Sequence, residues 1–133
     1  MICRHETIAD LASVLGVATV RRPVATWVGH TYTCPYVYSD GTMTLSVKEL
    51  PTLGATLVYV AELRRSLGDT GTVVDVGDGA FTTNNGSAVT RKDNKVLLVD
   101  VAQLPAQFGN PATTRAEVAL TVTDIILACW RGD

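Results

Sequence analysis

The chain has 133 residues, of which 47% are hydrophobic and 18% are charged, and its formal net charge at pH 7 is −2. This length and apolar content predict one well-packed domain and exclude an intrinsically disordered chain. The basic residues are scattered along the chain, which argues against nucleic acid as a partner, and no apolar run approaches the ~20 residues that a membrane-spanning helix needs.

Three segments repeat apolar residues at the three- and four-residue spacing of an amphipathic helix. The first segment ends at Gly16, and glycine commonly follows the last residue of a helix. The third segment starts with Thr114 and Glu117, which have the spacing of a capping box. The helices are expected near residues 6–16, 52–67 and 113–130.

The first predicted helix begins within a few residues of Met1, so the sequence shows no signal peptide ahead of it. Taken literally, this start indicates a cytoplasmic protein. The cysteines described below favour the other interpretation, in which the protein is extracytoplasmic and its leader has been removed.

Residues 42–48 alternate strictly between apolar and polar side chains, which is typical of a strand with one buried face. The preceding Asp40-Gly41 suits a type I′ turn, in which both central residues have positive φ. We therefore expect a hairpin between residues 31–38 and 42–48.

Two further turns connect strands in the second half of the chain. Asn85-Gly86 predicts a two-residue hairpin turn, and Asp93-Asn94 predicts a weaker one. The strands on either side of these turns are expected near residues 79–84, 87–91 and 96–101.

Gly77-Asp78-Gly79 lies where a strand enters this series of hairpins, not between a strand and a helix. A phosphate-binding loop would place its N–H groups at a helix N-terminus, so we interpret the two glycines as turn residues. The fold predicted for residues 1–133 is a single α+β domain. It contains one antiparallel β-sheet built from hairpins and covered by about three amphipathic helices.

Groups suited to catalysis are few. The only histidines, His5 and His30, lie in no recognisable nucleophile or metal motif, and the sequence contains no Cys-x-x-Cys pair. We therefore predict no catalytic residues, no metal site and no cofactor. The enzymatic alternative is a dispersed site assembled from His30, Asp75 and Asp78.

Four aromatic residues cluster within a dozen positions. Packing in the core is the interpretation that aromatic side chains so close to a strand favour, and a surface for a ligand or partner protein is the functional alternative. The candidate ligand or interaction residues are Trp27, Tyr32, Tyr36 and Tyr38.

The three cysteines allow several pairings. A bond between Cys3 and Cys34 would hold the first helix over the strand 31–38, with the tyrosines of that strand beneath it, and would indicate an oxidising compartment. Cys129 lies on the apolar stripe of the last helix and could replace one partner. A cytoplasmic protein with three free thiols is the remaining alternative.

The segments 2-ICRHETIADLASVLG-16, 34-CPYVYSDGTMTLSV-47 and 76-VGDGAF-81 occur in an order that resembles a group of small actinobacterial envelope lipoprotein domains of unknown function. The closing helix and the segment 89-VTRKDNKVLLVDV-101 extend the resemblance over nearly the whole chain. The resemblance implies a secreted domain with a disulfide between Cys3 and Cys34 and no established enzymatic activity.

We therefore expect a non-catalytic extracytoplasmic binding or interaction module of the bacterial cell envelope. Its expected partner is a small molecule or an envelope protein, and membrane contact is expected only through a lipid anchor that this sequence lacks. The alternatives are the small enzyme with a dispersed site and a cytoplasmic accessory or dimeric protein with free thiols.

Overall fold

The computed structural model of the chain describes residues 2–73 and 75–130. Its helices and strands follow one another as α1 His5–Leu15, β1 Thr26–Val28, β2 Thr31–Tyr38, β3 Gly41–Glu49, α2 Leu53–Leu67, β4 Gly71–Val73, β5 Gly79–Thr82, β6 Ala88–Lys92, β7 Lys95–Gln103, β8 Gln107–Gly109, β9 Ala112–Thr114 and α3 Arg115–Trp130. The predicted helices are confirmed to within about two residues at each end.

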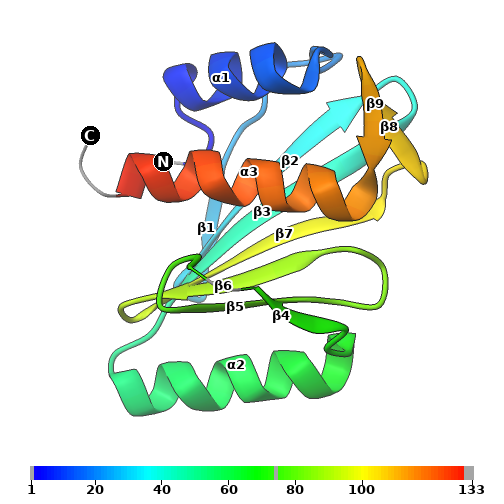
Figure 1. Ribbon diagram of the computed structural model, residues 1–133. Helices are drawn as coiled ribbons and strands as arrows, with labels where there is room; N and C mark the ends of the chain where they lie inside the picture. The colour runs from blue at the N-terminus through cyan, green and yellow to red at the C-terminus, as the bar shows by residue number, and fades with distance from the viewer. Residues whose placement is uncertain (1, 74, 131–133) are drawn as a thin grey trace.

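Seven of the strands form one antiparallel sheet in the order β1-β2-β3-β7-β6-β5-β4, and β8 and β9 form a separate two-stranded ribbon. Figure 1 shows α1 and α3 on one side of the large sheet and α2 on the opposite side. This architecture confirms the predicted α+β class and the main antiparallel sheet. The small ribbon is an addition to the prediction.

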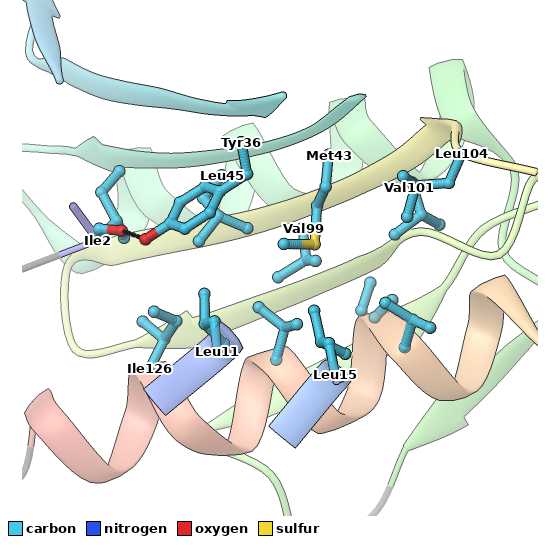
Figure 2. Packing of buried hydrophobic residues seen from close by; sticks show 14 of the residues in the cluster. Ile2, Leu11, Leu15, Tyr36, Met43, Leu45, Val99, Val101, Leu104 and Ile126 are labelled. Atoms are coloured by element: carbon cyan, nitrogen blue, oxygen red, sulfur yellow. Dashed lines mark hydrogen bonds between the residues drawn. The ribbon is translucent and has the colours of Figure 1, made fainter. Parts of the chain in front are cut away.

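The larger core lies between the sheet and the two helices α1 and α3. The predicted alternation of β3 is confirmed, because Met43, Leu45 and Val47 are fully buried in this core. Figure 2 shows how side chains from both helices meet those of the strands, among them Leu11, Leu15, Tyr36, Leu45, Val99 and Ile126.

A smaller core lies on the opposite face, under α2. Phe81, Val89 and Val96 are buried there, and apolar side chains from α2 pack against them. Val96 and Leu97 are neighbours on β7 and belong to different cores, as side-chain alternation along a strand requires. The central strands therefore supply buried residues to both layers of helix.

Gly16 ends α1 as predicted. Its φ is +71°, and its N–H donates to the carbonyl of Ala12 at 3.0 Å. A Cβ at this position would also overlap the carbonyl oxygen of Asn110. At α3, the N–H of Glu117 donates to Thr114 Oγ1 at 3.2 Å, which is the backbone half of the predicted capping box.

The hairpins formed where they were predicted, but two of the turns differ. The prediction of a type I′ turn with Asp40 and Gly41 at its centre is wrong. Tyr38 pairs with Gly41, so the two turn residues are Ser39 and Asp40. Asp40 does not have positive φ. Glycine is required at position 41 for a different reason, because a Cβ there would overlap the carbonyl of Gln103.

The predicted two-residue turn at Asn85-Gly86 is also wrong, because the connection is longer. Strand β5 ends at Thr82 and β6 begins at Ala88, and the turn is closed by a hydrogen bond from Gly86 N to Thr83 O at 3.0 Å. The Asp93-Asn94 turn is confirmed, since Lys92 and Lys95 pair on either side of it. Asp93 has a φ of +54°.

Candidate functional site

A disulfide joins Cys3, just ahead of α1, to Cys34 in the middle of β2. The two Cα atoms are 6.2 Å apart, and the two cysteines are 31 positions apart in the sequence. Cys34 is fully buried and Cys3 is partly exposed, while Cys129 keeps a free thiol. The predicted Cys3–Cys34 bond is confirmed, and it holds the N-terminal segment against the strand that carries three of the four candidate aromatic residues.

Tyr36 and Tyr38 lie in the core. The Tyr36 hydroxyl donates a hydrogen bond to the main-chain carbonyl of Ile2 at 2.5 Å, as Figure 2 shows. The Tyr38 ring packs edge-on against Phe108, with ring centroids 4.8 Å apart. Burial raises the pKa of Tyr38 to about 12. Burial, followed by the nearby Tyr38, raises the pKa of Tyr36 well above its ordinary value.

Trp27 and Tyr32 lie at the surface, where they are 45% and 38% exposed. They are direct cross-strand partners on β1 and β2, and their ring centroids are 4.2 Å apart. The ring of His30, in the turn between these strands, meets Trp27 edge-on at 5.6 Å. The four candidate aromatics are therefore divided into a buried pair and an exposed pair.

A groove of about 480 Å³ lies beside Tyr32; we call it the N-terminal groove. One part of its lining is residues 2–4, which include a disulfide cysteine, and another is residues 22–25, which lead into β1. Tyr32 and Glu49 complete the lining. The disulfide and the Tyr36–Ile2 hydrogen bond therefore fix one wall of the groove in place.

The N-terminal groove combines apolar and charged groups. Pro23 is buried and Val24 is 67% exposed, so this segment offers an apolar surface. Arg4 and Arg22 contribute guanidinium groups and Glu49 contributes a carboxylate. Guanidinium stays protonated at physiological pH, so the two arginines can bind an anion but cannot transfer a proton.

Two residues of the enzymatic alternative, His30 and Asp78, are not brought together, and the third, Asp75, is exposed three residues before Asp78. His30 lies in the turn between β1 and β2, while Asp78 immediately precedes β5. Strands β3, β7 and β6 lie between β2 and β5. At the usual strand spacing, β2 and β5 are therefore about 19 Å apart.

Asp78 has a structural partner instead. Its Oδ2 accepts a hydrogen bond from Asp93 N at 2.7 Å, and its carboxylate lies 3.6 Å from Arg91 and 3.8 Å from Lys92. The hydrogen bond from Asp93, followed by the two cations, holds the pKa of Asp78 below its ordinary value. Asp78 thus connects the loop before β5 to the turn between β6 and β7. This role accords with the predicted turn at Gly77-Asp78-Gly79.

Of the groove residues outside β2, the sequence singled out only Cys3 as a candidate site residue. Residues 22–25 have neither helical nor strand periodicity, and Arg4 and Glu49 belong to no motif. The one local signal was Pro23, which interrupts regular structure and precedes exposed apolar residues. Within residues 2–73 and 75–130 the structure contains no group of three His, Cys, Asp or Glu side chains placed to hold a metal ion.

No protein-family profile, no curated protein and no solved structure matches this chain. Among the helices of the described residues, none is both long enough and apolar enough to cross a membrane. The site must accordingly be interpreted from its own geometry.

Proposed function

We propose that the protein is a non-catalytic, extracytoplasmic binding module of the bacterial cell envelope, and that it takes a small ligand with an apolar body in the N-terminal groove. The observation that carries the proposal is a preformed groove whose wall is fixed by a disulfide. An exposed pair of aromatic rings in contact with each other, Trp27 and Tyr32, lies beside it.

The size and lining of the groove support a small-molecule ligand. Ligand pockets commonly measure roughly 300–1,000 Å³ and combine apolar walls with a few polar groups. The N-terminal groove, at about 480 Å³, falls in this range. Tyr32 offers a flat apolar face, and its contact with Trp27 restricts the ring before any ligand arrives.

The disulfide supports an oxidising compartment, because such bonds persist outside the cytoplasm and are rare within it. The groove chemistry supports binding over catalysis. Among the described residues of the lining, Glu49 is the one carboxylate, and it is accompanied by two arginines but by no histidine. General acid–base catalysis requires a group that exchanges protons near neutral pH.

Binding is best tested by NMR, with naphthalene-2-carboxamide as a neutral aromatic probe. We expect amide shifts concentrated in residues 2–4, 22–25 and 32, and an affinity that falls at least about fivefold in Tyr32→Ala, since an aromatic face of the groove is lost. Val28→Ala is the matched control: Val28 is 75% exposed on the same hairpin, points to the other face of the sheet and lines no part of the groove. Equal affinities for the two variants would overturn the proposal.

A further inference from the structure

We infer that the ligand of the N-terminal groove carries an anionic group, a carboxylate or a phosphate ester, which binds in a neighbouring cationic hollow. This inference rests on the proposed function, because it concerns the other end of the same ligand. The hollow measures about 230 Å³ and is lined by Arg4, Lys92, Asp93, Lys95, Cys129 and Trp130.

The groove and the hollow are neighbours. Arg4 lines both, so a ligand that extends past this side chain would reach from one into the other. The groove end offers Tyr32, Pro23 and Val24 to an apolar body. Among residues 2–73 and 75–130, the lining of the hollow contains three cations and one carboxylate, although the whole chain has a net charge of −2. The excess of positive charge is therefore local to this end of the sheet.

Strand register explains why the cations gather. Lys95 pairs directly with Lys92 on one side and with Glu49 on the other. Side chains of direct partners project from the same face of a sheet, so Lys92, Lys95 and Glu49 form one row on that face. Lys95 lies two residues before the core residue Leu97, so this is the face that α1 and α3 cover elsewhere in the sheet. Like charges directly opposite each other on a sheet are unfavourable unless an anion offsets them.

The carboxylates already present offset only part of this charge. Glu49 lies directly opposite Lys95 in the strand register, but among the described residues the two form no ion pair. Lys92 lies 3.8 Å from Asp78, and Arg4 lies 3.7 Å from Glu6 in an exposed pair. Lys95 has no ion-pair partner among residues 2–73 and 75–130. The arrangement therefore leaves at least one ammonium group available to a ligand.

A hydrogen-bond donor in the lining also lacks a partner. The indole Nε1 of Trp130 is buried and donates to no acceptor within the described part of the chain. This N–H can only donate, so the group that would satisfy it is an acceptor oxygen. Carboxylate and phosphate oxygens accept from indole, ammonium and guanidinium groups alike, which matches the donors that surround the hollow.

The cations could instead serve α3, whose C-terminal end carries partial negative charge and contributes Cys129 and Trp130 to the same hollow. The two roles differ in what they change. Cations that interact only with the C-terminal end of α3 would change the stability of the protein and leave its preference among ligands unaltered. Cations that bind a ligand affect that preference.

The test compares three naphthalene probes by calorimetry and NMR: the neutral 2-carboxamide, the 2-carboxylate and the 2-phosphate ester. We expect the wild type to bind at least one anionic probe about tenfold more tightly than the carboxamide. The tighter of the two anions identifies the headgroup. In Lys95→Gln we expect this ratio to fall toward one while carboxamide affinity stays within about twofold. Arg65→Gln is the control, since it removes one exposed positive charge from α2.

Each outcome decides a different point. Equal affinity for all three probes would overturn the anionic group and leave the proposed groove intact. A preference for the anion that survives in Lys95→Gln, or falls equally in Arg65→Gln, would overturn the assignment to the hollow. Absence of binding by every probe would overturn the proposed function together with this inference.

Discussion

The hydroxyl of Tyr36 and the carbonyl of Ile2, 34 residues apart in the chain, are joined by a buried hydrogen bond. Cys3, the next residue, is bonded to Cys34 on the same strand. Two side chains of β2 that point to the same face therefore hold two consecutive residues of the N-terminal segment. This double attachment positions α1 and one wall of the N-terminal groove.

Replacing Tyr36 with phenylalanine should leave the Ile2 carbonyl buried without a partner. We expect a loss of about 1–2 kcal/mol in the free energy of unfolding, measured by urea denaturation, with faster amide exchange in residues 2–4. Tyr38→Phe is the matched control, because the Tyr38 hydroxyl has no hydrogen-bond partner among the described residues. An equal loss in both variants would show that the Tyr36–Ile2 bond adds nothing.

Reduction of the disulfide should loosen the N-terminal segment before the rest of the molecule. The bond closes a loop of about 30 residues, for which the chain-entropy model gives roughly 3–4 kcal/mol. Hydrogen exchange should rise first across residues 3–16, because α1 contributes few buried side chains besides Leu11 and Leu15. Protection that stays unchanged on reduction would contradict this.

The same bond can be tested by mass. Alkylation of the folded, non-reduced protein should label Cys129 alone, because it is the single free cysteine. Labelling of Cys3 and Cys34 in the native protein would instead favour the cytoplasmic alternative with free thiols.

The buried tyrosines predict a loss of stability in alkaline solution. The pKa of Tyr38 rises from 10.0 to about 12 on folding, so the folded state keeps a proton that the unfolded state has released. Its contribution is fully present below pH 10 and is lost as the pH rises toward 12. Thermal unfolding followed by tyrosinate absorbance should show this decline, and Tyr38→Phe should make it shallower. An unchanged slope in Tyr38→Phe would exclude Tyr38 as a cause.

Asp78 should stabilise the fold in a pH-dependent way. Its pKa is lowered in the folded state, so its contribution is present at neutral pH and is lost as the pH falls through the acidic range. Because the carboxylate is partly exposed, we expect Asp78→Asn to cost only about 1 kcal/mol at neutral pH and almost nothing in acid. Asp75→Asn, at an exposed position of the same loop, is the control. Equal costs at both pH values would contradict the role of Asp78.

Patterns within single elements predicted most of the fold. The apolar periodicity of residues 115–130 and the alternation of residues 42–48 both survive in the structure, because each element buries one side against a layer that the pattern anticipates. The turn predicted at Asp40-Gly41 was placed one residue too late, because the requirement for glycine at position 41 comes from a distant part of the chain. Gly41 is required where the chain passes the Gln103 carbonyl, about 60 residues later.

The candidate site was predicted only in part. Alternation correctly places Tyr32, Cys34, Tyr36 and Tyr38 on one face, but it does not show where α1 and α3 stop covering that face. Coverage ends between Cys34 and Tyr32, which leaves one tyrosine exposed and buries the other two. The groove further depends on residues 22–25, whose position is set by contacts that no local pattern contains.

Because Cys3 is both a lining residue of the N-terminal groove and a member of the disulfide, the affinity of any ligand that occupied the groove would be thermodynamically linked to oxidation of the two thiols. Any molecule that binds the oxidised protein more tightly than the reduced one must lower the reduction potential of the Cys3–Cys34 couple, and it must do so by the same free energy. A titration of this couple against a glutathione buffer, with and without a groove ligand, would thus measure occupancy of the groove without any label on the ligand.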